Sequence, residues 1–416
     1  MASPWVRIGW RNLGRNRRRT ILTAGGLAVG YCGVVVLAGL TDGMVGEMLR
    51  NGTGVLSGQI QIHAPDYLPE RDMHRTIGGR DGTELSRLLE RADAQPGVAA
   101  AAPRVYAGGL VSTGGATIGA TLIGIDPTRE ARTTLLLGSL REGRVPRDGA
   151  NEILLGSEMA RTLDAQLGDE IVVVAPAADG SLGNDLFTVS GIYHSGIGDL
   201  DVSTALLPIG TLQRLLALDP GRIHEVVVRV PDPWAAPGIA DALQTAITDP
   251  SVAVQPWTTF RPEMADYARL AQSSFWLVLV IVFTMAIFGV ANTLLMATFE
   301  RRFEIALLRA LGAGPGGLVR AIVAEALALG VIATGIGALV GLVLITWWHH
   351  KPPDLSVFFG GFSMMGSYIR PVLRTEYPWP MFGWAAIALI LTAVLAALYP
   401  AYRAIRTPAA ETLAGR

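Results

Sequence analysis

Four long stretches without a charged residue constrain the fold of this chain more than any other feature. They hold between 20 and 24 residues each and run over residues 21–40, 275–298, 326–348 and 381–402. An α-helix rises about 1.5 Å per residue, so each stretch is long enough to cross the hydrocarbon core of a bilayer. The charged fraction of the whole chain is 17%, against about 25% in ordinary soluble proteins. We therefore expect a membrane protein with four transmembrane helices.

The segment between the first two stretches carries most of the charge and has the patterns of a folded domain. Apolar and polar residues alternate over residues 55–64, which predicts a strand, and Leu85, Leu88 and Leu89 at helical spacing predict a helix over residues 82–94. Further strand and helix patterns alternate up to residue 255. The expected fold class is an α-helical membrane protein with four transmembrane helices and a large mixed α+β extracytoplasmic domain between the first and second.

The positions of the arginines predict the orientation in the membrane. Arginine and lysine in short segments next to the spans favour the cytoplasmic side, whereas long translocated domains do not follow this rule. Six arginines precede the first stretch, three lie in the loop of residues 299–317 after the second, and three follow the fourth. Both termini are therefore expected in the cytoplasm of a multi-pass protein, and we take the first stretch as a retained anchor.

These patterns together predict nine segments. In chain order they are a cytoplasmic amphipathic helix (1–19), transmembrane helix 1 (20–41), the extracytoplasmic α+β domain of two subdomains (42–272), transmembrane helix 2 (273–298), a cytoplasmic helix (299–317), transmembrane helix 3 (318–348), an extracytoplasmic loop (349–380), transmembrane helix 4 (381–402) and a cytoplasmic tail (403–416).

Motifs for catalysis or metal binding do not stand out. The glycine-rich run from Gly312 to Gly317 lacks the lysine and hydroxyl residue of a nucleotide-binding P-loop, and neither a G-x-S-x-G nor an H-E-x-x-H motif occurs. Cys32 alone cannot form an intrachain disulfide or a cysteine zinc site. His349 and His350 beside Asp354 are the best metal candidates, but a polar membrane edge explains them better. We expect no catalytic residue and no metal, and a net charge of −1 argues against nucleic acid as a partner.

The segment Glu300 to Ala313 between the second and third spans predicts a short charged amphipathic helix. Phe303, Leu307 and Leu311 share one face of this helix. Periodicity alone leaves two interpretations open: a surface helix that only completes the turn, or a helix whose apolar side chains dock in a groove of a cytoplasmic partner.

Several motifs resemble one known family. The run from Asn292 to Met296, the pairs Glu300-Arg301 and Glu304-Ile305, and the run from Leu308 to Ala313 resemble the signature of the MacB, LolC, LolE and FtsX superfamily of ABC transporter permeases. Similar runs recur along nearly the whole chain, including Trp10 to Leu13, Gly124 to Pro127, Val189 to Ile192 and Tyr399 to Ala404. The size of the outer domain makes the chain most similar to the lipoprotein-releasing, LolC/LolE-like permeases.

This resemblance implies a location and a set of partners. The chain would be a permease of the bacterial inner membrane, bound to a cytoplasmic ABC ATPase dimer that holds ATP and Mg²⁺, with no cofactor on the chain itself. A second permease chain, identical or homologous, membrane lipids, and a lipoprotein or a periplasmic carrier or adaptor are the further partners. The short helix would be the coupling helix on the ATPase, with the contact residues Glu300, Arg301, Arg302, Phe303, Glu304, Leu307, Leu308, Arg309, Leu311 and Gly312.

The function that follows is mechanical. Closure of the ATPase would push the coupling helix, and stiff spans would carry the motion to the outer domains to release or move a lipoprotein or another amphipathic cargo. Two alternatives stay open: an FtsX-type signalling complex that activates an envelope hydrolase, and adaptor-coupled efflux of the MacB type. The candidate cargo or dimer surface consists of Val36, Leu37, Leu40, Phe275, Trp276, Leu279 and Val282 in the outer halves of the first two spans.

One carboxylate lies inside a span. Glu325 lies about two turns into the third span. If it faced lipid it would be costly, by roughly 2.5–3.5 kcal/mol at the bilayer centre. We expect it to face protein or water, and either to reach the cytoplasmic edge or to pair with Arg320, five residues earlier.

Overall fold

The computed structural model describes residues 17–80, 82–355, 362–364, 367–369 and 372–406. Residues 1–16 of the amphipathic helix expected over residues 1–19 lie outside these ranges, and residues 17–19 are the start of a longer helix. Most of the tail expected over residues 403–416 also lies outside. The described chain divides into two compact units. One contains the chain up to Val45, Arg269–Leu355 and the chain from Val372 onward, and the other contains Gly46–Ala268 and Ser356–Pro371.

The first unit is helical. Its long helices are α2 (Arg17–Gly52), α10 (Pro262–Glu300), α12 (Pro315–His350) and α13 (Trp379–Arg406), with the short α11 (Arg302–Ala310) between α10 and α12. Among the described residues, four helices are long and apolar enough to cross a membrane, and they contain the four charge-free stretches. The expectation of four apolar spans is confirmed. A short antiparallel pair, β11 (Phe362–Met364) and β12 (Ser367–Ile369), follows α12 in sequence and belongs to the second unit.

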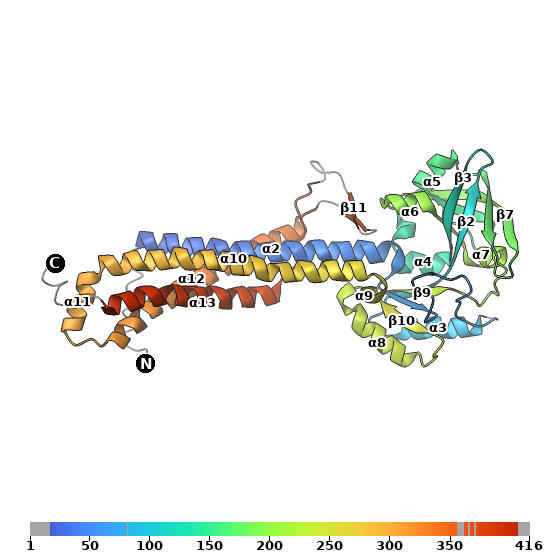
Figure 1. The fold of residues 1–416 in the computed structure, drawn as a ribbon. Coiled ribbons are helices and arrows are strands. Elements are labelled where there is room, and N and C mark those ends of the chain that lie inside the picture. The colour runs from blue at the N-terminus through green and yellow to red at the C-terminus, as the bar shows by residue number, and fades with distance from the viewer. Residues whose placement is uncertain (1–16, 81, 356–361, 365–366, 370–371, 407–416) are drawn as a thin grey trace. The chain divides into compact units, whose positions relative to one another are not determined.

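The four long helices lie alongside one another and share one apolar core (Figure 1). Each helix contributes fully buried side chains to it, among them Tyr31, Leu279, Ala333 and Leu389. Small residues allow close approach, because a Cβ on Gly337 would lie 2.7 Å from the carbonyl oxygen of Ala28. This glycine of α12 therefore packs against α2 of the same chain.

The chain before α13 packs closely against α2 at two glycines, Gly39 and Gly43. A Cβ on Gly43 would lie 2.0 Å from the carbonyl oxygen of Arg374, and one on Gly39 would lie 2.8 Å from that of Glu376. The backbone N–H of Glu376 donates to the carbonyl of Gly39 at 2.9 Å. Only glycine permits this contact, since any side chain at these two positions would collide with the backbone.

The second unit contains a mixed ten-stranded sheet. Its strands are β1 (Ile60–His63), β2 (Ala100–Ser112), β3 (Thr117–Ile125), β4 (Leu140–Gly143), β5 (Glu152–Gly156), β6 (Glu170–Pro176), β7 (Leu182–Tyr193), β8 (Thr204–Pro208), β9 (Glu225–Arg229) and β10 (Ala253–Pro256). They follow the order β10-β1-β9-β2-β3-β8-β5-β7-β4, and β6 pairs with both β2 and β7. The pairs β3–β8 and β5–β7 are parallel, and the other pairs are antiparallel.

The double pairing of β6 closes part of this sheet into a ring of six strands, β2-β3-β8-β5-β7-β6. The long strand β2 makes the closure possible, because its first half pairs with β9 and its last residues, Leu110 to Ser112, pair with β6. Closure removes free edges from these strands. The mixed α+β domain between the first two spans is thus confirmed, whereas its division into two subdomains stays a prediction.

Helices cover the sheet. They are α3 (Thr83–Ala94), α4 (Pro127–Thr133), α5 (Ser157–Leu163), α6 (Gly198–Ser203), α7 (Ile209–Leu215), α8 (Ala236–Ala246) and α9 (Trp257–Phe260), with short turns η1 (Thr53–Ser57), η2 (Leu136–Ser139) and η3 (Pro233–Ala235). Helix α4 packs on β2, α7 on β3 and α8 on β10. Asp126 caps α4 by accepting from the N–H groups of Thr128 and Arg129.

The strand expected over residues 55–64 is wrong in its first half. Thr53–Ser57 form a π-helical turn that directly continues α2, and only Ile60–His63 are extended. The change occurs at Gly58, whose φ of +67° favours glycine. Alternation of apolar and polar residues does not distinguish a short strand from the end of a long helix with a buried face.

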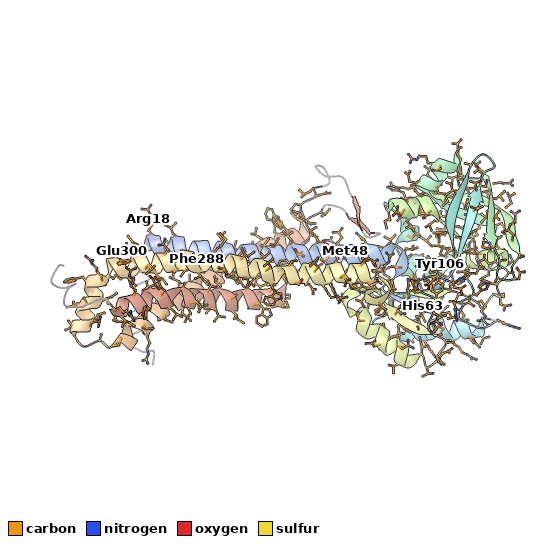
Figure 2. All side chains as sticks on the ribbon, in the orientation of Figure 1. Arg18, Met48, His63, Tyr106, Phe288 and Glu300 are labelled. Carbon is orange, nitrogen blue, oxygen red and sulfur yellow. The ribbon has the colours of Figure 1, made fainter. Side chains whose placement is uncertain are left out.

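A buried polar network lies in the core of the second unit, where Figure 2 labels Tyr106 and His63. Arg104 is fully buried and donates two hydrogen bonds to Glu130, at 2.5 and 3.2 Å. It also donates to the Tyr106 hydroxyl at 3.0 Å, and that hydroxyl donates to Glu225 at 2.5 Å. A buried ion pair of this kind is tolerated because further hydrogen bonds satisfy its charged groups.

His224 extends this network as a neutral side chain. Its Nδ1 accepts a hydrogen bond from the backbone N–H of Tyr106 at 2.9 Å, so the proton resides on Nε2, which donates to the carbonyl of Met73 at 3.0 Å. Burial lowers the pKa of His224, although the hydrogen bond to Met73 and the charges of Glu225 and Asp72 oppose the shift. Both ring nitrogens of this histidine are thus hydrogen-bonded within the core.

We expect the outer domain to fold by itself as a fragment from Gly54 to Arg261. The fragment retains all ten strands of the mixed sheet and holds only two tryptophans, Trp234 and Trp257, of which Trp257 is 1% exposed. Tryptophan fluorescence in a urea titration should show one cooperative transition, with a free energy of unfolding of about 5–15 kcal/mol. A fragment that aggregates, or unfolds without cooperativity, contradicts an independent core.

The same fragment should lose stability as the pH falls below about 6.5, the ordinary pKa of histidine. In this range the unfolded chain binds a proton on His224 that the native state, with its lowered pKa, does not bind, so acid favours unfolding. Urea unfolding at pH 7.5 and 5.5 measures the difference. The variant His224→Gln should show a smaller difference between the two pH values, and an equal one would contradict this account.

Candidate functional site

The short helix α11 forms because the chain leaves the axis of α10 at one residue. Helix α10 ends at Glu300, and Arg301 adopts φ −101° and ψ 13°, after which nine helical residues follow. At the other end Gly312 has φ +92°, and the N–H groups of Gly312 and Ala313 donate to the carbonyls of Arg309 and Leu308. This is a glycine-dependent helix end. Pro315 then starts α12.

One face of α11 is apolar and exposed. Phe303, Leu307 and Leu311, each four residues after the previous one, are 57%, 48% and 77% exposed. Ala306, in contrast, is 2% exposed and faces the helical unit. An exposed stripe of large apolar side chains on a helix outside the predicted spans is typical of an interaction surface.

The remaining residues of the predicted coupling site surround this stripe. Glu300, Arg302, Glu304 and Gly312 are exposed, Leu308 and Arg309 are half-buried, and Arg301 is buried. Figure 2 labels Glu300 at the end of α10, where the chain enters α11. The structure thus brings the ten residues together on one short helix and its two ends.

Arg301 and Glu325 form an ion pair inside the helical unit. Nη1 of Arg301 lies 3.3 Å from Oε2 of Glu325, and the two side chains are 10% and 9% exposed. They line a small cavity of about 90 Å³ together with Leu294, Leu308 and Leu318. The expected pairing with Arg320 is therefore wrong. Arg320 lies five residues before Glu325, which places it on a different face of α12, and its side chain is exposed.

Two further arginines connect this region to α13. Nη1 of Arg309, in the last turn of α11, donates to the carbonyl of Ile405 at 2.9 Å. The guanidinium of Arg403 lies over the ring of Phe299, 4.7 Å from its centroid. The end of α10 and the whole of α11 are consequently held against both α12 and α13.

The candidate cargo or dimer surface on α2 and α10 divides into buried and exposed residues. Leu279 and Phe275 are 7% exposed, and Val36, Leu40 and Val282 are half-buried. Leu37 and Trp276 remain 42% and 49% exposed. Most of this surface therefore packs within the chain's own helices, and Leu37 and Trp276 are the parts that face outward.

Aromatic residues mark the end of the spans that is expected to face outward. Trp276 contacts Trp384 edge to face with ring centroids 5.8 Å apart, and Tyr377 stacks on Trp379 at 5.6 Å. Such belts are typical of the membrane–water interface. His349 belongs to the same layer, because its Nδ1 lies 2.7 Å from the carbonyl of Thr375 and its ring lies against Tyr377.

The described residues hold no group of three His, Cys, Asp or Glu side chains close enough to bind a metal. The pair His349-His350 with Asp354, the best metal candidate in the sequence, thus lacks a ligand geometry in the part of the chain that the structure describes. The contacts of Arg301 with Glu325 and of Gly43 with Arg374 escaped the sequence analysis, because neither pair has a local sequence signal.

Comparison with known proteins identifies the two parts of the chain. The model of the MacB-like periplasmic core domain matches residues 20–246, and that of the FtsX-like permease C-terminal domain matches residues 276–409. The first match alone covers more than half of the chain.

Two relatives match along nearly their whole length. The lipoprotein-releasing system transmembrane protein LolC of Neisseria meningitidis serogroup B is 26% identical over 98% of both chains, and LolE of Haemophilus influenzae is 24% identical over 99% of both. Among solved structures, the periplasmic region of MacB from Actinobacillus actinomycetemcomitans matches 52% of this chain and 95% of its own, with 15% identity and a TM-score of 0.36.

The four apolar helices and the similarity to LolC and LolE indicate a protein of the inner membrane. The first match covers the first apolar helix and most of the mixed domain, and the second covers most of the last three apolar helices. The chain therefore belongs to the MacB, LolC, LolE and FtsX superfamily of ABC transporter permeases.

Proposed function

We propose that this permease transmits closure of a cytoplasmic ABC ATPase mechanically to its outer domain, and that the motion releases or moves a lipoprotein or another amphipathic cargo. The observation that carries this proposal is the exposed stripe of Phe303, Leu307 and Leu311 on a helix that is firmly held by its neighbours. ATP and Mg²⁺ are bound by the partner ATPase. Both termini and α11 then lie in the cytoplasm.

The stripe has the properties of an anchor for a groove in another protein. Amphipathic helices bind such grooves through apolar side chains at intervals of three and four residues. Buried apolar anchors usually dominate the affinity, whereas charges at the rim contribute less. Phe303, Leu307 and Leu311 are the anchors in this account, and Glu300, Arg302 and Glu304 form the rim.

The length and continuity of α10 support a mechanical role. The helix runs without interruption over the 39 residues of Pro262–Glu300, which corresponds to about 58 Å. No proline interrupts it after its first residue. A displacement at its cytoplasmic end would therefore be carried along the axis and not absorbed at a kink.

The cargo is inferred from the relatives and from the chemistry of the spans. LolC and LolE are named for lipoprotein release. A lipid chain that leaves the bilayer needs an apolar surface, since each buried CH₂ contributes about 0.8 kcal/mol. The exposed side chains of Leu37 and Trp276 offer such a surface, which a second permease chain, identical or homologous, would enclose.

Replacing Leu307 by Asp should abolish copurification of the ATPase with the permease. The substitution puts a charge in the centre of an apolar contact, where its desolvation is not compensated. Leu307→Ala should weaken binding by about 2 kcal/mol or more, as for other central anchors, and Arg302→Ala, at the rim of the same helix, serves as the matched control with a small effect. Undiminished copurification of Leu307→Asp would remove α11 from the ATPase contact.

A photoreactive amino acid at Leu37 or Trp276 should capture lipidated cargo before ATP is added and lose it during ATP turnover. The same probe at Leu279, which is 7% exposed, is the buried control and should give little cargo adduct. Crosslinks to phospholipid or a partner permease alone, unchanged by ATP, would contradict extraction of cargo. That outcome would favour an FtsX-type signalling role.

A further inference from the structure

We infer that Arg301 and Glu325 are a positioning pair that fixes the start of α11 to α12, so that the ATPase moves α10, α11 and α12 together. This inference rests on the proposed coupling function of α11. It assigns a role to Glu325, a buried carboxylate of the helical unit that the coupling function itself does not use. Neither residue needs to contact the ATPase.

Arg301 lies at the junction of α10 and α11. It is the residue at which the backbone turns from α10 into α11, and the N–H of Ile305 still donates to its carbonyl at 3.0 Å. The side chain of the hinge residue thus points into the helical unit, to Glu325 on α12, while its main chain starts α11. A contact at this residue controls the angle between the two helices directly.

The ion pair of Arg301 and Glu325 is buried. Both side chains are about nine-tenths buried, and apolar residues such as Leu294 and Leu318 line the cavity around them. In such surroundings a charge without its partner is strongly unfavourable, so the pair stays joined as α11 moves. Apolar contacts alone are non-directional and allow sliding between helices.

The two ends of α11 are attached in different ways. At the far end Nη1 of Arg309 donates to the half-buried carbonyl of Ile405 on α13 at 2.9 Å. The pair at the near end joins two full charges between buried side chains. The near end is therefore attached to α12 by an ion pair between two side chains, so we expect α12 to follow the start of α11.

The test is the distance between α11 and α12 in the assembled complex with the ATPase. With Cys32 replaced by Ser, spin labels at Arg302 and Leu327, both exposed, report this distance without and with a non-hydrolysable ATP analogue. In the otherwise unchanged chain the distance should not shift with nucleotide. In Glu325→Ala it should shift or split into two populations, while the ATPase still copurifies.

Two further variants separate positioning from general stability. The double exchange Arg301→Glu with Glu325→Arg restores opposite charges and should restore the nucleotide-independent distance. Arg320→Ala, which removes the neighbouring arginine on α12, should behave like the unchanged chain. A distance in Glu325→Ala that does not shift, even if its melting temperature falls, would overturn the positioning role. If instead Leu307→Asp still binds the ATPase, the coupling function itself has failed.

Discussion

The hydrocarbon core of a membrane offers no hydrogen-bond partner, and this constraint accounts for most of the helical unit. Helices satisfy their own backbone groups, which explains the four long apolar helices. Polar side chains among them must then find partners within the protein. The hydroxyl of Tyr31 donates to the carbonyl of Phe382 at 2.9 Å, and Glu325 pairs with Arg301. These two polar contacts therefore join different helices and fix their relative positions.

In the outer domain, pairing between strands satisfies the hydrogen-bonding groups of the backbone. Its strands pair in a ring of six, with further strands at the sides, so that few edges stay open. The buried pair of Arg104 and Glu130 holds α4 against β2. A domain that is stabilised by its own core can move as one body, which a mechanical role in the envelope requires.

The sequence was sufficient for features with a local signal. The four spans, α11 and most strands followed from hydropathy and periodicity, because these patterns extend over many residues. The turn at Thr53–Ser57 was missed because a buried helix end and a strand have similar patterns over five residues.

Contacts between distant residues could not be predicted from one sequence. Glu325 has Arg320 as its neighbour in sequence but pairs with Arg301, which precedes α11. Three-dimensional packing also determines how β6 closes the sheet. The same holds for the close approach of the backbone of Arg374 to Gly43. For the same reason the candidate surface on α2 and α10 contained residues such as Leu279 that the chain's own helices bury.

The central claim is that nucleotide binding in the cytoplasm moves the outer domain, and a distance within one chain tests it most directly. Spin labels at Thr162 on α5 and at His350 at the end of α12, both exposed, can be placed in a chain with Cys32 replaced by Ser and bound to its ATPase. The account predicts that the distance between the labels shifts when a non-hydrolysable ATP analogue binds. A distance that stays the same while the nucleotide is bound would contradict mechanical transmission.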